Sequence, residues 1–392
     1  MGVESRPGSP AGLYVHLPLC ASRCPYCEYP VSVERDPEAV GGAYVEAVLA
    51  EFDRHRSRVS GRDIRTLYIG GGTPSALADA QLARLIRELT ARTGELTEVT
   101  LEVNPEDASD MALEKWVEAG VTRLILGLQS LQGEVLAALG RRHGPECARR
   151  AYRAAAAVEP GQLGVDLLFG APVQTLSVWE RDLDWLADAE AVDVATAHEL
   201  TCEEPTPLGR AVERGRIAGV PAERRGEMLD RFLSVCRDRG WTRHEVATLG
   251  RSAAHGQHQR LYWTGGEYLG LGAGASGFLL EDGVPTRTTH PVDFARYVAD
   301  PPADPLTESL DEADYLGERL ALGLQSTVGI DLDVVEEQFA ESAVRESVER
   351  AVELFDGWCE RGMLERRGAR YRPTDAGFRV LNVLERRVRR IA

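Results

Sequence analysis

Three cysteines lie within eight consecutive positions close to the start of the chain. Cys20, Cys24 and Cys27 follow the spacing Cys-x3-Cys-x2-Cys in the stretch "LCASRCPYC". On a short loop this spacing lets three thiolates converge on one centre, whereas a structural zinc site requires a fourth Cys or His with a pair spacing of its own. Three thiolates without a fourth ligand fit a 4Fe-4S cluster in which one iron stays open to a substrate or cofactor.

The other four cysteines do not supply a fourth ligand. Each is solitary, and Cys147, Cys236 and Cys359 fall inside helical, partly apolar patterns, so we expect these side chains to be buried small hydrophobes. Cys202 is expected to behave likewise, and the odd total of seven cysteines disfavours a disulfide framework. His16 is close to the motif, but it occupies a predicted strand before the loop and is therefore a weak candidate ligand.

The composition is that of an ordinary globular protein and argues against two classes of partner. Hydrophobic residues make up 43% and charged residues 27%, and no stretch approaches the ~18 to 20 apolar residues of a membrane span. The net charge of −17 disfavours a nucleic-acid backbone as partner, and we interpret the arginine-rich "LERRVRRIA" near the C-terminus as a solvated helix face. The first eleven residues contain no apolar run typical of a secretion signal, so we predict a cytoplasmic location.

The segments that must position the thiolates alternate between strand and helix. Apolar, β-branched runs predict strands at 12–17, 64–70, 98–103, 121–128, 162–170 and 192–200. Amphipathic segments predict helices at 38–59, 79–93, 109–119, 146–157 and 177–188. Such alternation implies parallel pairing through right-handed crossovers.

This pattern predicts an α/β fold, a partial (β/α)6 barrel of the TIM type. In such a barrel the loops after the C-terminal ends of the strands form the working face. The cysteine loop follows the first predicted strand, and the glycines at 70–72 follow the second. Both are therefore expected to open on the same mouth.

Beyond residue 200 the regular alternation of predicted strands and helices ends. After a helix at 222–239, the glycine-rich stretch 262–278 is expected to be strand and loop that close one side of the barrel, and 299–309 is a proline-rich connector. Helices at 311–322, 331–340 and 343–363, a hairpin in "MLERRGARYRPT" and a final helix from 374 indicate a small α+β module similar to a winged helix. We therefore predict two domains, residues 1–300 and 301–392.

The cysteine motif is the first of an ordered series. It is followed by "GGGTP" (70–74), "EVNP" (102–105), "LGLQS" (126–130), "LGRRH" (139–143), "DLLFGAP" (166–172), "LTCEEPTPL" (200–208) and "YWTGGEYLGLGAGA" (262–275). Together these motifs resemble the radical S-adenosylmethionine (SAM) superfamily, in the branch of oxygen-independent coproporphyrinogen III dehydrogenase, its heme chaperone relative and the class C methyltransferases. The resemblance implies that SAM chelates the open iron and is cleaved reductively to a 5'-deoxyadenosyl radical.

The resemblance also assigns residues to SAM. Glycines allow close backbone approach to the methionyl part, and a carboxylate at a strand end suits ribose hydroxyls. For the cluster-bound SAM the resemblance implies Tyr14, Gly71 and Glu102. For a second SAM beside it the implied residues are Tyr26, Gly72, Thr73, Gln129, Arg141 and Asp166. An ion pair between Arg141 and Asp166 without a cofactor role is the alternative for those two.

Some positions depart from the pattern of the branch. The dehydrogenase has a longer segment before the cluster loop and a further cysteine where this chain has Tyr29, so porphyrinogen decarboxylation is not expected. The heme chaperone carries a His-Asn-x-x-Tyr-Trp motif, and here "HQRLYW" keeps His258 but has Gln259 in place of the Asn. Ile125 replaces an expected Ser in the fourth strand.

Two expected tyrosines are replaced by histidines. They are His198, near the end of the sixth predicted strand, and His244, next to Glu245. Imidazoles titrate near neutral pH and move protons, as a methyltransferase that uses two SAM molecules requires. We therefore expect transfer of a methyl or methylene group to an sp2 carbon of a small-molecule or peptide-borne natural product, with His198, His244 and Glu245 as catalytic candidates.

The alternative is a heme chaperone, which binds heme for insertion into target proteins. In that case His258 is a heme ligand, whereas otherwise it is a retained structural contact. A weaker third possibility is an anaerobic heme-modifying enzyme. The resemblance implies an electron donor such as flavodoxin or ferredoxin, and we expect neither a membrane nor a nucleic acid as a partner.

Overall fold

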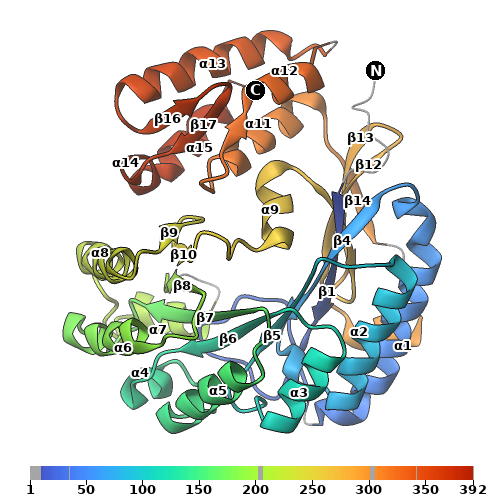
Figure 1. The fold of residues 1–392 in the computed structure, drawn as a ribbon, viewed down its shortest axis with the longest axis vertical. Coiled ribbons are helices and arrows are strands. Elements are labelled where there is room, and N and C mark those ends of the chain that lie inside the picture. The colour runs from blue at the N-terminus through green and yellow to red at the C-terminus, as the bar shows by residue number, and fades with distance from the viewer. Residues whose placement is uncertain (1–9, 35, 202–205, 301–304, 341, 392) are drawn as a thin grey trace.

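The chain folds around a wide, curved β-sheet (Figure 1). The computed structural model describes residues 10–34, 36–201, 206–300, 305–340 and 342–391. Seven neighbouring strands of this sheet are parallel, in the order β11-β1-β4-β5-β6-β7-β8. They are β1 (Pro10–Leu17), β4 (Asp63–Gly71), β5 (Glu98–Val103), β6 (Arg123–Gln129), β7 (Gln162–Phe169), β8 (Val194–Glu199) and β11 (Glu267–Leu271).

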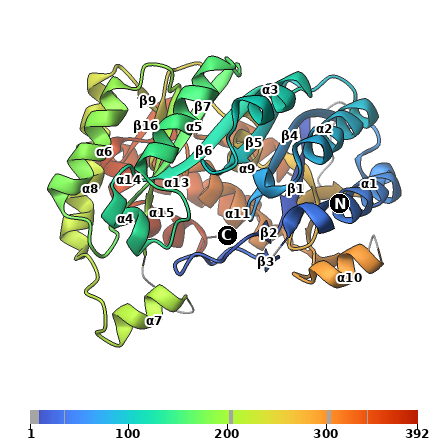
Figure 2. The same cartoon turned by 90° about the horizontal axis from the view of Figure 1, so that it is seen from below.

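Helices cover the outer face of the curve (Figures 1 and 2). They are α1 (Pro37–His55), α2 (Asp79–Thr93), α3 (Asp110–Glu118), α4 (Gly133–Ala138), α5 (Pro145–Ala157), α6 (Leu176–Asp188) and α8 (Ala222–Asp238). Each buries an apolar stripe at helical spacing, as α2 does with Leu82, Leu85, Ile86 and Leu89. The strand and helix order predicted from the sequence, and the α/β partial barrel, are therefore confirmed.

The sheet stays open because antiparallel strands flank the parallel ones at both edges. Beyond β11 lie β12 (Ser276–Glu281), β13 (Val284–Thr289) and β14 (Leu306–Ser309), and beyond β8 lie β10 (Thr248–Gly250) and β9 (Thr242–Arg243). The segment 299–309, predicted to be an irregular connector, thus contains a strand in its second half, because β14 pairs with β13. Residues 301–304 of that connector lie outside the described residues.

The stretch predicted as strand and loop from residue 262 begins as a helix. Helix α9 (Gln257–Thr264) includes Tyr262 and Trp263, and Gly265, in the left-handed conformation at φ 66°, ends it. Strand β11 starts only at Glu267. The prediction is therefore wrong for residues 262–264, because burial of His258 and Leu261 on one helix face outweighs the strand preference of two aromatic residues.

The C-terminal part forms a module with its own apolar core. It contains α11 (Glu312–Gly323), α12 (Leu332–Gln338), α13 (Arg345–Glu360), α14 (Asp375–Arg379), α15 (Leu381–Val388) and a three-stranded sheet of β15 (Ile330–Asp331), β17 (Arg370–Pro373) and β16 (Leu364–Arg367). The helix expected from 374 is two helices, which meet at Val380. The division of the chain at residues 300 and 301 stays a prediction. Among the described residues, no helix is both long and apolar enough to cross a membrane.

This module contacts the barrel beside α9 and β9, as Figure 1 shows. The Thr327 hydroxyl donates a hydrogen bond to the Arg243 carbonyl at 2.9 Å. Glu245 and Ser326 form an isolated antiparallel bridge. The module is therefore joined by backbone contacts to the segment that follows β9.

A buried carboxylate ties α1 to the segments after the parallel strand at the other edge. The Glu51 side chain is fully enclosed. Its Oε2 accepts hydrogen bonds from the Gly272 N–H at 2.9 Å and from the Tyr297 hydroxyl at 2.5 Å, and Tyr297 belongs to α10 (Phe294–Ala299). Its Oε1 lies 2.8 Å from Nε2 of His290. Glu51 thus fixes the turn that follows β11.

Replacing Glu51 with alanine should destabilise the fold by about 3–5 kcal/mol, because it leaves the Gly272 and Tyr297 donors and the His290 ring without their buried partner. Thermal unfolding followed by circular dichroism measures this. The matched control is Glu46→Ala on the same helix, whose carboxylate is 61% exposed and bonds Arg84, so its effect should be within about 0.5 kcal/mol. Equal shifts in the two variants would contradict a bracing role for Glu51.

Candidate functional site

The C-terminal ends of the parallel strands surround a cavity of about 480 Å³. This volume is in the range typical of cofactor and small-molecule sites. Most of the residues expected from the sequence line it: Cys20, Cys24, Tyr26, Cys27, Gly71, Gly72, Thr73, Glu102, Gln129, Arg141, Asp166, His198 and Glu245. The structure thus brings together residues from the second to the sixth predicted strands, or from the turns just after them, and from the cysteine loop.

The three cysteines face this cavity as free thiols. Cys20 ends β2 (Leu19–Cys20), and Cys24 and Cys27 lie on the loop that leads to β3 (Ser32–Val33). The Cys27 N–H donates to the Cys24 carbonyl at 3.1 Å, and the Thr73 hydroxyl lies 3.4 Å from Sγ of Cys20. Burial raises the pKa of the Cys20 and Cys27 thiols, and metal binding would take these groups up as thiolates.

This donor set fits an iron–sulfur cluster better than a single ion. Among the described residues, no group of three or more His, Cys, Asp and Glu side chains is arranged to hold one metal ion. A 4Fe-4S cluster differs because each thiolate binds an iron of its own, so the sulfurs need not converge on a single atom. Cys20, Cys24 and Cys27 are the residues that would hold it.

His16 is occupied elsewhere and does not act as a fourth ligand in this structure. Its Nδ1 and Nε2 lie 2.9 Å from the Tyr14 hydroxyl and from the Pro30 carbonyl oxygen. The ring is buried, which lowers the pKa of His16. His16 therefore anchors the far end of the cysteine loop, at Pro30, to β1.

The glycine turn after β4 packs against the end of β1. The Gly72 N–H donates to the Leu17 carbonyl at 2.8 Å, and a Cβ on Gly72 would lie 2.8 Å from the Pro18 carbonyl. Gly71 has φ 117°, and its Cβ would lie 2.8 Å from the His16 ring. Neither position accepts a side chain without movement of the backbone or of His16. Their contact with SAM stays a prediction.

Glu102, at the end of β5, is placed deep in the cavity wall. Its Oε1 accepts a hydrogen bond from the Tyr68 hydroxyl at 2.6 Å, and its Oε2 accepts one from the Gly71 N–H at 3.3 Å. Burial, with the charge of Asp166, raises the pKa of Glu102 to about 7, against the effect of the Tyr68 bond. Tyr14 packs on the Tyr68 ring at 6.0 Å but is not among the residues that line the cavity.

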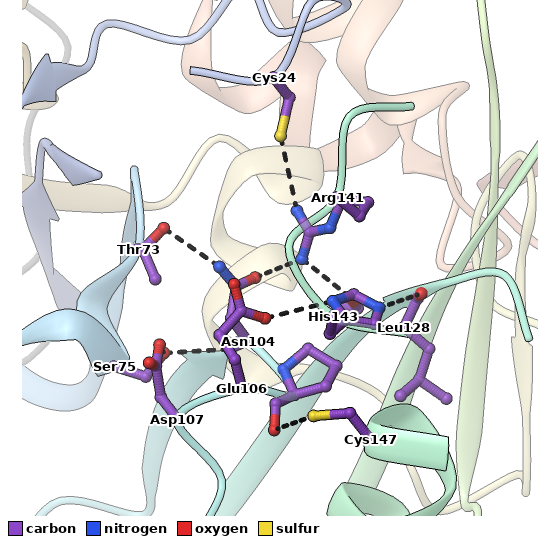
Figure 3. Close-up of polar contacts among 12 residues, drawn as sticks. Cys24, Thr73, Ser75, Asn104, Glu106, Asp107, Leu128, Arg141, His143 and Cys147 are labelled. Atoms are coloured by element: carbon purple, nitrogen blue, oxygen red, sulfur yellow. Dashed lines mark hydrogen bonds and ion pairs between the residues drawn. The ribbon is translucent and has the colours of Figure 1, made fainter. Parts of the chain in front are cut away.

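Arg141 links the cysteine loop to the end of β5 (Figure 3). Its Nη2 donates to Oδ1 of Asn104 at 2.7 Å, and its Nη1 lies 4.0 Å from Sγ of Cys24. Asn104 in turn donates to the Thr73 hydroxyl at 3.2 Å. Arg141 therefore does not form the ion pair with Asp166 that was the alternative to a cofactor role.

Two further predicted residues lie beside this group. Burial raises the pKa of Tyr26 to about 12, although the positive charge of Arg141 opposes the shift. Gln129 ends β6 with φ 63°, at a point where the pairing with β7 shifts register. A left-handed non-glycine residue at a cavity edge is typical of a functional site rather than of regular sheet.

Asp166 pairs with His198 on one wall of the cavity. The Asp166 Oδ1 and His198 Nε2 atoms are 3.7 Å apart, on the neighbouring strands β7 and β8. The His198 side chain is 54% exposed and projects into the cavity. Burial opposes protonation of this ring, but the Asp166 carboxylate outweighs it and holds the pKa of His198 above its usual value. This pair can hold or move a proton at Nε2.

His244 and Glu245 occupy different environments. The His244 ring is buried against the His255 ring, with centroids 3.7 Å apart, and it is not among the cavity-lining residues. Burial and the neighbouring His255 lower the pKa of His244 to about 4. Glu245 does line the cavity, and it accepts a hydrogen bond from Nε1 of Trp263 at 2.8 Å. A catalytic role for His244 stays a prediction to which this geometry adds no support.

His258 is enclosed between α9, β1 and β4. Its Nδ1 lies 2.8 Å from the Thr66 hydroxyl and its Nε2 lies 2.9 Å from the Tyr262 hydroxyl. The side chain is fully buried, and burial lowers its pKa to about 3. In this structure both ring nitrogens lie within hydrogen-bond distance of a hydroxyl. Of the two roles considered for His258, heme ligand and structural contact, the geometry fits the structural contact.

Several lining residues were not singled out from the sequence. Asn104 follows a predicted strand within the "EVNP" motif, so its position was a usable signal. Tyr68 lies inside β4, Arg123 begins β6 and Gln259 lies on α9, and no local pattern at these places distinguishes a cavity residue from a core residue. Cys202 lies outside the described residues.

Comparison with family models identifies two matching segments. The model of the radical SAM superfamily matches residues 14–186, which span β1 to α6. The model of the HemN C-terminal domain matches residues 310–380, within the C-terminal module.

The chain is also similar to curated proteins over most of its length. It is 34% identical over 341 residues to the mitochondrial radical S-adenosyl methionine domain-containing protein 1 of Bos taurus, covering 83% of this chain and 75% of that protein. It is 28% identical over 339 residues to the heme chaperone HemW of Bacillus subtilis, covering 84% of this chain and 87% of that protein. Among solved structures, coproporphyrinogen III oxidase (HemN) from Escherichia coli superposes with a TM-score of 0.80 at 19% identity. The superposition covers 98% of this chain and 91% of that one, which shows a shared fold.

Replacing Cys20, Cys24 or Cys27 with alanine should abolish the cluster, because three thiolates are its whole protein ligand set. Iron and acid-labile sulfide per polypeptide, measured after anaerobic reconstitution, test this. Cys147→Ala and Cys359→Ala serve as controls, since these thiols lie outside the cavity lining and their loss should leave the content unchanged. A triple variant that still holds a full cluster would show that the ligands lie elsewhere.

Proposed function

We propose that this chain binds a 4Fe-4S cluster and SAM in one cavity and that it handles heme as a heme chaperone. The proposal starts from the family, because the chain belongs to the radical SAM superfamily and to its coproporphyrinogen-oxidase-like branch. The observation that carries the first part is the convergence of Cys20, Cys24 and Cys27 on the cavity that Glu102 lines. The second part is supported by relatives named heme chaperone HemW, one of which matches 84% of this chain.

The residues of the cavity have distinct tasks in this proposal. The cysteines hold the cluster, which when bound supplies the electron that cleaves the sulfonium of SAM. Gly71 and Gly72, which line the cavity without side chains of their own, present backbone groups to the methionyl part. Glu102 accepts hydrogen bonds from the ribose hydroxyls. Arg141 places a positive charge beside Cys24.

Heme would find one imidazole in this cavity. His198 is the histidine among the lining residues, whereas both nitrogens of His258 are bonded inside the protein. Tyr29, beside Cys27, is 63% exposed and offers an aromatic face at the same cavity. We therefore assign His198, and not His258, as the heme ligand in the chaperone proposal.

A second candidate function is transfer of a methyl or methylene group from a second SAM to an sp2 carbon of a natural-product substrate. The observation that favours it is the Asp166–His198 pair, because a positioned imidazole with a carboxylate partner is suited to accept a proton from a reacting carbon. Tyr26, Thr73, Gln129 and Arg141 line the space in which the second SAM would lie.

Both candidate functions require an electron donor and share a proposed location, but they differ in substrate and partner. An electron must reach the cluster, for which we propose a donor such as flavodoxin or ferredoxin. We propose the cytoplasm as the location. The substrate under methyl transfer would be a small or peptide-borne unsaturated molecule, and under the chaperone proposal the partner would be a protein that receives heme.

Hemin added to the cluster-loaded protein should give a saturable Soret band, and His198→Ala should remove or shift this band, because His198 is the histidine that lines the cavity. Absorption titration measures the effect. His258→Ala is the comparison variant and should keep the band, provided that circular dichroism shows an intact fold.

Loss of the band in a folded His258→Ala protein, with retention in His198→Ala, would overturn the ligand assignment. Absence of any Soret band in the unaltered protein would sink the chaperone proposal. Formation of both S-adenosylhomocysteine and 5'-deoxyadenosine with an unsaturated substrate would then favour methyl transfer.

The affinity for SAM should rise about tenfold between pH 6 and pH 8, because an ionised Glu102 accepts ribose hydrogen bonds more strongly than a neutral acid and its pKa lies at about 7. Anaerobic calorimetry on the cluster-loaded protein measures this, and Glu102→Gln should bind more weakly without the slope. Glu106→Gln is the matched control, since burial raises the pKa of Glu106 but its hydrogen bonds and the charge of Arg141 together outweigh burial and lower it. A slope that persists in Glu102→Gln would assign the titration to another group.

A further inference from the structure

Strand β6 lines the cavity along its whole length. Arg123, Ile125, Gly127 and Gln129 all face the cavity, as alternate residues of one strand do. At about 3.3 Å per residue, Arg123 and Gln129 are about 20 Å apart along the strand. Because Gln129 lies at the C-terminal end, near the cysteine loop, Arg123 marks the opposite, inner end of the cavity.

Arg123 is a buried cation that is incompletely paired. Its exposed fraction is 3%, and its Nη1 donates a hydrogen bond to Oε1 of Gln259 at 2.6 Å. Its Nε is a buried donor without a partner, and the part of the chain that the structure describes provides no ion pair to its guanidinium. A guanidinium has five N–H donors, and burying it without a counter-charge is costly.

Two carboxylates of this region, Glu98 and Glu245, have other partners. Both oxygens of Glu98 accept from backbone N–H groups at the start of α9, those of Gln257 at 2.7 Å and His258 at 3.0 Å. Glu245 accepts from Nε1 of Trp263 at 2.8 Å, and burial raises the pKa of Glu245 although the Trp263 bond and the positive charge of Arg123 oppose the shift. Arg123 therefore retains charge that an anionic ligand group could neutralise.

We propose that Arg123, oriented by Gln259, binds a carboxylate of the ligand that occupies the inner end of the cavity. The planar fork of a guanidinium matches a carboxylate with two parallel hydrogen bonds. Gly256 leaves room for this arrangement, since a Cβ there would lie 2.7 Å from Nη1 of Arg123. The inference rests on the proposed function, which offers two sources of the carboxylate: a propionate of heme, or the methionyl carboxylate of a SAM molecule.

The test compares ligands with and without the carboxylate in the cluster-loaded protein. Hemin is compared with hemin dimethyl ester, and SAM with decarboxylated SAM, by absorption titration and anaerobic calorimetry. In the unaltered protein the carboxylate form of the ligand that reaches Arg123 should bind about 10- to 100-fold more tightly than its counterpart. Arg123→Met should lose this preference, and Arg123→Lys, which keeps the charge, should retain part of it.

Arg65→Met is the matched control, because Arg65 lies on the outer surface with Asp63 and removal of its charge should leave the preference intact. A structural role alone would weaken both forms of a ligand equally in Arg123→Met. Loss of the preference for hemin or for SAM supports the proposal and identifies the source. A preference that persists for both ligands in Arg123→Met, or that is absent for both in the unaltered protein, overturns it. Failure of the proposed function is distinct, since the unaltered protein would then bind neither hemin nor SAM.

Discussion

The imidazole of His16 is the contact on which the geometry of the cavity depends. It bonds the Tyr14 hydroxyl and the Pro30 carbonyl, and its ring fills the space that a side chain at Gly71 would need. Gly274, in the turn after β11, approaches the same ring. The end of the cysteine loop and the glycine turn are thereby held at fixed distances, so thiolates and backbone groups face one ligand. A larger residue at these glycines would separate them.

Much of the fold was predictable because its signals are local. Continuous apolar runs with turn residues after them identify the parallel strands, and 3- and 4-residue spacing identifies the covering helices. Helix α9 was missed because Tyr262 and Trp263 favour strands, whereas the burial that makes them helical comes from contacts with β4 and β11. The edge strand β14 was missed for a similar reason, since its pairing with β13 is not encoded in the connector itself.

The site divides along the same line. Residues at or just after strand ends, such as Glu102 and Thr73, were found because parallel topology brings all such ends to one mouth of the barrel. Arg123 could not be found in this way, since it begins its strand and reaches the cavity from the inside. The placement of His244 depends on its packing against the His255 ring. The replacement of an expected tyrosine by His244 therefore did not reveal that this ring lies outside the cavity lining.

The bridge between Glu245 and Ser326 makes one wall of the cavity a joint product of two units of the chain. The C-terminal module is therefore more than an appended domain, because its backbone sets where a cavity-lining carboxylate lies. Chimeras that graft a relative's module onto this barrel would alter ligand selectivity as well as folding. A substitution in the module that displaces the backbone at Ser326 would therefore also displace Glu245 at the cavity wall.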